Sequence, residues 1–391
     1  MSRFLFVVPP LTGHTNPTVS VGRELMARGH DAAWVAHREV VEPLLPPGAR
    51  LIPVSESLSA DLVGHITERA RGLRGASAFK FLWEEFLRPL AYSMVPGVHA
   101  AVDEFRPDVL LVDQQALAGA LVARQRGIVW ATSATTSAEF ADPYAHLPRL
   151  GEWVVNNLRQ FQRDFGVSEA DAARGDLRFS EHLVLVFSTK ALVGAERAFP
   201  PHYQFVGPSF VGRVERLDEF PWDWLDDVPR VLVSLGTVNA EAGDRFYATV
   251  IEALGGRDLQ VILVAPRDRI GTVPSNILVC DHVPQLALLD RVDAVVSHGG
   301  HNTVCEALAR GLPLVVAPIR DDQPVIAQQV VDAGAGVRVR FGRVRPRDLV
   351  AAVDEVLTRP CYREAAARIR ASFESAGGAA AAAQLLETLA C

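Results

Sequence analysis

Short, continuously apolar runs alternate with stretches of helical periodicity along most of the chain. Residues 3–9, 32–36 and 107–112 are apolar at nearly every position, which is typical of strands buried on both faces of a parallel sheet. Between the first two runs, apolar residues recur at helical spacing, and Asn16 and Pro17 suit the N-cap and the first position of that helix. Strand, helix and strand in this order, with short connections, predict a doubly wound α/β domain.

A second series with the same pattern begins after residue 227. Apolar runs at 231–235, 259–264, 277–280 and 293–296 alternate with helical stretches, so a second α/β domain is expected. The segment before this series contains prolines and tryptophans and has no clear period, which is typical of a linker. We therefore predict an N-terminal domain over residues 1–206, a linker over 207–227, a C-terminal domain over 228–364, and a helical tail over 365–391 that packs back toward the N-terminal domain.

Length and composition narrow the class of protein. The 391 residues suggest two or three domains of about 150 residues each. Hydrophobic residues make up 49% and charged residues 22%, as in globular proteins, and the net charge of −7 offers no basic surface for nucleic acid. No apolar run reaches the roughly 18 residues that a membrane-spanning helix needs, so no membrane insertion is expected. The four cysteines are scattered, and we interpret them as reduced thiols of a cytoplasmic protein.

The stretch from Ser297 to Gly311 predicts an anion site. It follows an apolar strand and places Gly299 and Gly300 just before an amphipathic helix. Glycine lets the backbone approach a ligand closely, and the first N–H groups of a helix bind phosphate. His298 is expected at the carboxyl edge of the sheet, where open α/β sheets bind their ligands. The alternative interpretation is a buried histidine in an ordinary strand-to-helix turn.

Further polar residues extend this candidate site. Thr303 offers a hydroxyl in the first turn of the helix. The carboxylate of Glu306, one turn further on, suits the diol of a sugar because it only accepts hydrogen bonds. A second glycine turn, from Ser234 to Thr237, follows the first strand of the same domain. Two such turns at one edge of a sheet indicate a nucleotide as the ligand.

His14 and Asp113 are the candidate catalytic residues of the first domain. Each follows an apolar strand, so both are expected at the carboxyl edge of the sheet, where residues 133–137 supply further hydroxyls. A buried carboxylate that accepts from one imidazole nitrogen makes the other nitrogen a stronger base. Such a pair, opposite a phosphate site, suits the transfer of a group from a phosphate leaving group to an alcohol. A surface histidine and a solvated loop aspartate are the alternative.

Several other chemistries lack their sequence signatures. Neither half has a GxGxxG fingerprint after its first strand, which argues against a nicotinamide-dependent oxidoreductase. No Walker lysine motif supports kinase chemistry. No HExxH motif or paired Cys/His cluster argues for a metal.

Three motifs together resemble a known family. They are GHTNP at 13–17, HVPQ at 282–285, and SHGGHNTVCEALARGLPLVVAPIRDDQP at 297–324. They are similar to motifs of the sugar-nucleotide-dependent glycosyltransferases of the UDP-glycosyltransferase superfamily, particularly the bacterial natural-product and carotenoid enzymes. This resemblance implies the GT-B fold, in which two Rossmann-like domains face each other across a cleft and the C-terminal domain holds most of the donor. It also implies inversion at the anomeric carbon, no metal, and no cofactor other than the sugar nucleotide, which is a co-substrate.

The resemblance also assigns roles to individual residues. His14 corresponds to the base that deprotonates the acceptor hydroxyl in the acceptor-binding N-terminal domain, and Asp113 to the carboxylate that orients it. Two positions depart from the family pattern, because His282 stands where many relatives have a base-stacking tryptophan and Asp321 replaces a common glycine. The resemblance places the diphosphate on His298, Gly299, Gly300, Asn302, Thr303 and Thr237, the nucleoside on His282, Val283, Gln285 and Glu306, and the donor sugar on Asp322 and Gln323.

The acceptor is indicated by an aromatic segment around residues 79–92. Phe79, Trp83 and Phe86 either belong to an ordinary core or line an apolar acceptor pocket. The resulting hypothesis is a hexosyl transfer from a UDP- or dTDP-sugar to a hydroxyl of a small, apolar or ring-bearing natural product. An epimerase or hydrolase of sugar nucleotides on the same fold is the alternative. A catalytically silent helper is a further alternative, although it would be expected to lack His14 or Asp113.

Overall fold

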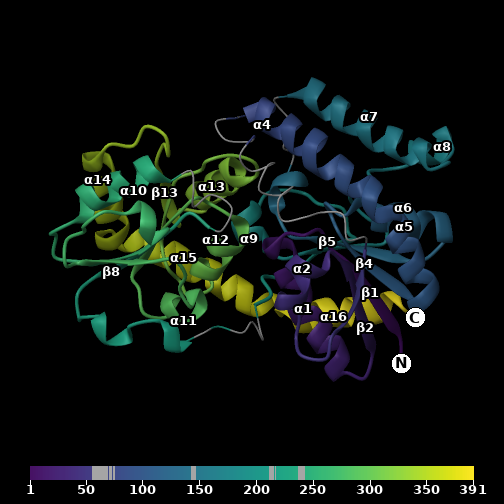
Figure 1. Ribbon diagram of the computed structural model, residues 1–391, viewed down its shortest axis with the longest axis horizontal. Coiled ribbons are helices and arrows are strands. Elements are labelled where there is room, and N and C mark those ends of the chain that lie inside the picture. The colour runs from purple at the N-terminus through teal and green to yellow at the C-terminus, as the bar shows by residue number, and fades with distance from the viewer. Residues whose placement is uncertain are drawn as a thin grey trace. The chain divides into compact units, whose positions relative to one another are not determined.

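The computed structural model describes residues 1–54, 69, 73, 75–141, 147–210, 215, 217–236 and 243–391. These residues form two compact units, each built around one parallel sheet (Figure 1). The first unit comprises Met1–Thr189, Ala198–Arg213 and Ala376–Cys391, and the second comprises Lys190–Arg197 and Val214–Ser375. No helix of the described residues is long and apolar enough to cross a membrane.

The sheet of the first unit has the strand order β3-β2-β1-β4-β5-β6-β7, and all neighbouring strands are parallel. The predicted strands at 32–36 and 107–112 are present as β2 and β4, which confirms the α/β interpretation. In the described part of this unit the strands are β1 (Arg3–Val7), β2 (Asp31–Ala36), β3 (Arg50–Pro53), β4 (Val109–Asp113), β5 (Trp130–Ala134), β6 (Leu183–Val186) and β7 (Tyr203–Phe205).

Helices cover both faces of this sheet. One face, which carries Phe4, Phe6 and Trp34, is buried under α1 and α16, and the other, which carries Leu5 and Val7, is buried under α5 and α6. The helices that the structure describes here are α1 (Thr12–Ala27), α2 (Arg38–Val41), α4 (Gly75–Phe81), α5 (Arg88–Phe105), α6 (Leu117–Arg126), α7 (Pro148–Asp164), α8 (Glu169–Ala172) and α16 (Gly378–Leu389), with shorter turns η1 (Glu42–Leu44), the π-helical η2 (Leu82–Leu87) and η3 (Ser137–Glu139).

The sheet of the second unit repeats the same topology. Its order is β10-β9-β8-β11-β12-β13, again entirely parallel, and α10 and α14 bury one of its faces. Its described strands are β8 (Arg230–Ser234), β9 (Gln260–Val264), β10 (Ile277–Cys280), β11 (Ala294–Ser297), β12 (Leu314–Val316) and β13 (Gly336–Arg338). Its described helices are α9 (Lys190–Val193), α10 (Asp244–Leu254), α11 (Gln285–Leu289), α12 (His301–Leu308), α13 (Gln323–Asp332), α14 (Pro346–Thr358) and α15 (Pro360–Ala376), with turns η4 (Leu217–Glu219), η5 (Trp222–Trp224) and η7 (Arg267–Arg269).

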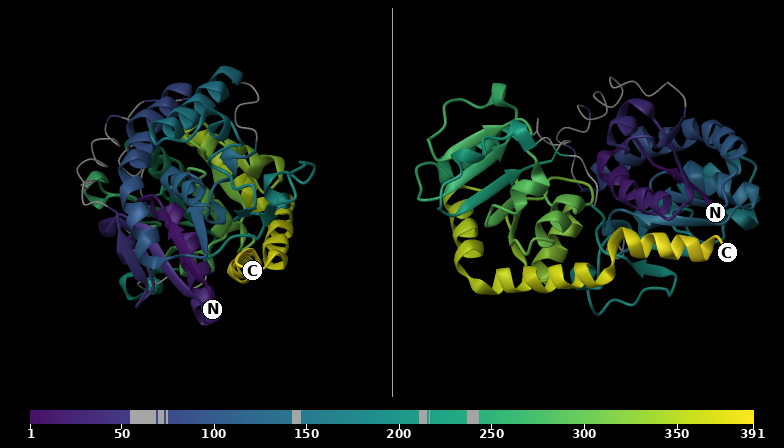
Figure 2. Two further views of the ribbon diagram at one scale, coloured as in Figure 1. Left: turned by 90° about the vertical axis from the view of Figure 1, so that its right-hand side faces the viewer. Right: turned by 90° about the horizontal axis from the view of Figure 1, so that it is seen from below.

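The last two helices belong to different units. Helix α15 lies in the second unit, and α16 packs along α1 in the first, as Figure 2 shows for the yellow C-terminal helix. Ala382, Ala383 and Leu386 of α16 are buried in the core cluster beneath α1. The carboxylate of Glu387 accepts hydrogen bonds from Arg28 and His30, both at 2.9 Å.

A single glycine allows α1 to lie close to the sheet. Trp34 is fully buried on β2, its ring stacks on Phe6 at a centroid distance of 4.7 Å, and its Nε1–H donates to Thr18 Oγ1 at 3.0 Å. A Cβ atom on Gly22 would lie only 2.4 Å from two atoms of the Trp34 ring. The indole therefore fills the space that a side chain at position 22 would occupy.

The fold predicts a large effect for a small substitution at this contact. Gly22→Ala should destabilise the protein by about 1–3 kcal/mol, because the buried indole must leave its stacked position. Urea unfolding followed by tryptophan fluorescence measures the change. Gly271→Ala is the matched control, since a Cβ there meets nothing within 4 Å. Equal unfolding midpoints for both variants would contradict this account of the packing.

Candidate active site

The predicted catalytic pair lies where the first sheet reverses its strand order. Strands β1 and β4 are neighbours, and the chain continues from their carboxyl ends to His14 and Asp113. His14 Nδ1 is 2.9 Å from Asp113 Oδ1 and 3.0 Å from Oδ2. Open α/β sheets bind their ligands at this kind of reversal. The structure therefore brings together the two residues that the sequence singled out.

His14 lies in the first turn of α1 and not in a loop before the helix. We expected the helix to start at Pro17, but it begins at Thr12 and continues through the proline. The prediction was wrong because the φ angle of proline is that of a helix, so Pro17 removes one backbone donor but does not mark the start of this helix. The N–H groups of His14 and Thr15 already donate to the carbonyl of Leu11, both at 3.0 Å. The helix thereby fixes the backbone of His14.

Asp113 is held as a buried acceptor. Its side chain is 0% exposed, whereas that of His14 is 16% exposed. Besides the imidazole, the backbone N–H of Gln115 donates to Oδ1 at 2.9 Å and the hydroxyl of Thr135 donates to Oδ2 at 3.0 Å. Both carboxylate oxygens lie within hydrogen-bond distance of Nδ1, which favours the tautomer of His14 with its proton on that nitrogen. The Nε2 lone pair of the imidazole is then available as a base.

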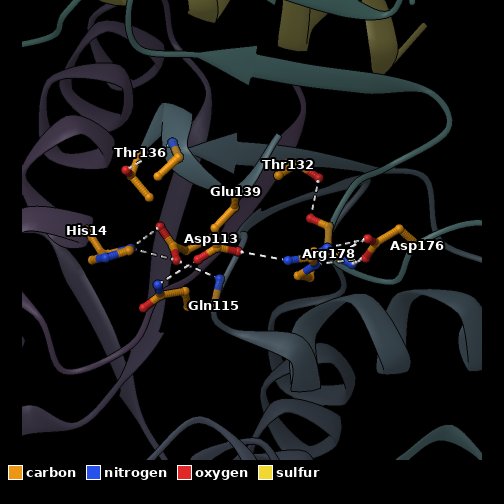
Figure 3. A network of polar contacts seen from close by, with 9 residues as sticks. His14, Asp113, Gln115, Thr132, Thr136, Glu139, Asp176 and Arg178 are labelled. Atoms are coloured by element: carbon orange, nitrogen blue, oxygen red, sulfur yellow. Dashed lines mark hydrogen bonds and ion pairs between the residues drawn. The ribbon is translucent and has the colours of Figure 1, made fainter. Parts of the chain in front are cut away.

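A second carboxylate belongs to the same network (Figure 3). The Nε2 amide of Gln115 donates to Glu139 Oε1 at 2.8 Å, and Arg178 lies 3.5 Å from Oε2. Burial raises the pKa of Glu139 above its usual value, and Arg178 and the hydrogen bond from Gln115 offset only part of this shift. The sequence did not point to Gln115, Glu139 or Arg178. Hydroxyls from residues 133–137 were expected at this edge of the sheet, and Thr135 is one of them.

The aromatic residues proposed for the acceptor pocket pack largely into the core. Trp83 and Phe86 are 4% and 6% exposed and belong to the core cluster beneath α5, against which the half-buried Phe79 also packs. The indoles of Trp83 and Trp153 meet edge to face at 6.2 Å. Core packing accounts for these contacts, and a role of the three residues in acceptor binding stays a prediction.

The predicted anion site lies at the equivalent reversal of the second sheet. His298 follows β11 directly, next to the turn that follows β8. Its ring is buried beside two glycines: a Cβ on Gly236 would lie 2.7 Å from its Cε1 atom, and a Cβ on Gly300 would lie 2.4 Å from Nε2. Gly236 and Gly299 also have positive φ angles of 71° and 86°. Glycine is therefore required at these turns by both conformation and space.

Burial also determines the charge of His298. It lowers the pKa of the ring to about 4, although Asp322 opposes this shift. The imidazole is therefore neutral at pH 7 and can donate a hydrogen bond without carrying a charge. Asn302 and Thr303 are half-buried in the first turn of α12, whose N-cap is Gly300. Predicted Thr237 lies outside the described residues.

The predicted nucleoside residues are connected to one another. Gln285, the first residue of α11, donates through its side-chain amide to Glu306 Oε2 at 2.5 Å, and Glu306 is buried. The carboxylate of Glu215 accepts from the backbone N–H groups of residues 286 and 287, which fixes the start of α11. His282 is exposed and Val283 is half-buried just before this helix.

The predicted sugar-binding pair forms the start of α13. Gln323 Oε1 accepts from the backbone N–H groups of Ile319 and Arg320 at 2.9 and 3.2 Å. Its NH₂ group thereby has a fixed direction, and Asp322 is the N-cap residue of the helix. Asp321 has a φ of 56°, in the left-handed region that favours glycine. This conformation agrees with the glycine that is common at this position in the family that the sequence resembles.

Metal ligands do not gather in the part of the chain that the structure describes. No group of three or more His, Cys, Asp or Glu side chains there could hold a metal ion. The sequence-predicted residues instead form two sets. The first unit holds His14 and Asp113, and the second holds the residues predicted for the nucleotide and the donor sugar.

Comparisons with known proteins identify relatives of this chain. The family model "Erythromycin biosynthesis protein CIII-like, C-terminal domain" matches residues 248–389. The chain is 30% identical to 4'-demethylrebeccamycin synthase of Lentzea aerocolonigenes, over 99% of each chain. It is 29% identical to demethyllactenocin mycarosyltransferase of Streptomyces fradiae, over 100% of this chain and 87% of that protein. The solved glycotransferase of kitacinnamycin matches with a TM-score of 0.78 and 28% identity, over 99% of each chain.

The glycines around His298 lead to a test of the anion site. Gly300→Ala should displace the imidazole and lower the affinity for UDP and dTDP by about tenfold or more, because a hydrogen bond to a charged group is lost. Isothermal titration calorimetry with both nucleotides measures this. Gly271→Ala again serves as the control and should bind like the parent protein. Unchanged affinity in a folded Gly300→Ala variant would show that His298 does not bind the diphosphate.

Proposed function

The chain belongs to the UDP-glycosyltransferase superfamily, and from this premise we propose its substrates and the roles of its residues. It is a glycosyltransferase of the natural-product type with the predicted GT-B fold. Its donor is a uridine or thymidine diphosphate hexose, and its acceptor is a hydroxyl of a small, apolar or ring-bearing natural product. The observation that carries the proposal is the hydrogen-bonded pair His14–Asp113 at the strand reversal of the first unit.

The first role is general-base catalysis by His14. Asp113 accepts the Nδ1 proton, and Nε2 takes the proton of the acceptor hydroxyl as its oxygen attacks the anomeric carbon. The imidazolium that forms is next to an ionised carboxylate, which stabilises the positive charge. Attack on the face opposite the leaving group inverts the anomeric centre, so an α-linked donor gives a β-glycoside.

The second role is stabilisation of the leaving diphosphate. The bond between the anomeric carbon and the phosphate oxygen breaks with its electron pair, and negative charge grows on the diphosphate. The neutral ring of His298 and the N-terminal N–H groups of α12, which begins at His301, are suitable donors for that charge. This assignment needs no metal in the transfer step.

The remaining residues select the donor. Glu306 accepts from the ribose hydroxyls, and Gln285, which already donates to Glu306, fixes its direction. The amide NH₂ of Gln323 and the carboxylate of Asp322 contact the hydroxyls of the sugar. The names of the two relatives, a synthase of a rebeccamycin derivative and a mycarosyltransferase, support a natural-product acceptor.

Substitution of the catalytic pair tests the proposal. UDP-glucose and dTDP-glucose are incubated with a panel of macrolides, carotenoid alcohols, phenols and indolocarbazoles, and glycosides are detected by mass spectrometry. His14→Ala should lower turnover by about 10²–10⁴-fold, the usual contribution of a general base, and Asp113→Asn should act in the same direction. Binding of the nucleotide, measured by calorimetry, should persist in both variants.

His182→Ala is the matched control, because this exposed histidine precedes β6 at the opposite edge of the sheet. It should retain full turnover. Full turnover in His14→Ala would show that His14 is not the general base. Rapid epimerisation or hydrolysis of the donor without any acceptor would replace the transferase proposal by its alternative.

A further inference from the structure

Glu139 is a second acidic residue beside the catalytic pair. It ends the turn η3 after β5, and its side chain is 15% exposed. Its carboxylate accepts from the Gln115 amide at 2.8 Å and lies 3.5 Å from a guanidinium nitrogen of Arg178. The family assignment gives this residue no role, and the pair His14–Asp113 is complete without it.

Gln115 connects the two carboxylates. Its backbone N–H donates to Asp113 Oδ1 at 2.9 Å, and its side-chain amide donates to Glu139 Oε1. Gln115 is itself buried. A displacement of Glu139 therefore acts on the residue that holds Asp113. Figure 3 shows this path from His14 to Arg178 as one series of contacts.

Arg178 does not depend on Glu139 for its counter-ion. Its side chain is 6% exposed, and Asp176 binds it through two nitrogens, with Nε–Oδ1 at 3.0 Å and the terminal nitrogen–Oδ2 at 2.6 Å. The contact with Glu139 is longer, at 3.5 Å. Among the described residues, the charged groups that face Glu139 are Arg178 and His14, and Asp176 binds Arg178. Two carboxylates, Glu139 and Asp176, thus share one guanidinium, so a single positive charge faces two acidic groups.

Gln114 lies at the same place. It follows Asp113, its side chain is buried, and its amide lowers the pKa of the Glu139 carboxyl.

We propose that Glu139 is a positioning residue of the His14–Asp113 pair, which it orients through Gln115 and whose imidazolium it stabilises by its negative charge. The inference rests on the proposed function for its role in catalysis, since the imidazolium forms when His14 removes the acceptor proton. The charge acts across the network and not by contact with substrate. The two groups are close enough for a Coulomb interaction, and such an interaction is stronger near a partly buried imidazole than in bulk water.

The test measures the protonation of His14 directly and needs no acceptor. Histidine is labelled with carbon-13 at Cε1, and the His14 signal is assigned by its loss in His14→Gln. Glu139→Gln should lower the pKa of His14 by about 0.5–1 unit, because the imidazolium loses a nearby anion. Glu139→Asp retains the charge and should stay close to the parent value. Glu152→Gln, the same change on an exposed residue of α7, should have no effect.

A second variant separates orientation from charge. Gln115→Leu removes the side-chain donor to Glu139 but keeps the backbone N–H that binds Asp113, so we expect a smaller shift in the same direction. Thermal unfolding and dTDP binding establish that each variant is folded. An unchanged His14 pKa in both folded variants would overturn the proposal and leave Glu139 a structural residue. Turnover retained in His14→Ala would instead overturn the base mechanism, whatever the titration shows.

Discussion

Each sheet reverses its strand order once, and the candidate site depends on these two reversals. Between β1 and β4, and between β8 and β11, the connecting helices leave toward opposite faces of the sheet, so the loops at the carboxyl ends of the strands separate. Side chains placed just beyond those strands are then partly buried yet still reachable. His14 and Asp113 occupy one such place, and His298 the other.

The two reversals have opposite electrostatic characters. In the first unit, the histidine that we propose as the base contacts Asp113, whose carboxylate also accepts hydrogen bonds from the Gln115 backbone and the Thr135 hydroxyl. In the second, a histidine is buried deeply enough to stay neutral, and glycines leave it no room to move. A base needs nearby negative charge, whereas an anion site needs donors without a surplus of it. One topology thus supports both functions because a few side chains set the local charge.

The sequence predicted the parts of the fold and the site that depend on local pattern. Apolar strands, glycine turns and the amphipathic helix at α12 indicated the residues at the carboxyl edges, and the structure brings His14 and Asp113 together as expected. The contacts of Glu139 with Gln115 and Arg178 join residues 24 and 39 positions apart, and no periodicity carries that information. Likewise, the aromatic spacing around Trp83 indicates burial but not what the ring is buried against.

The placement of α16 has a consequence for how the molecule is made. The first unit needs Ala376–Cys391 to cover the apolar face beneath α1, although the rest of that unit is finished by residue 213. During synthesis from the N-terminus, this face therefore stays uncovered until the whole second unit has left the ribosome. A fragment that ends before α16 would leave exposed the apolar surface that this helix covers. The N-terminal half of the chain therefore lacks one helix of its own unit until α16 has been synthesised.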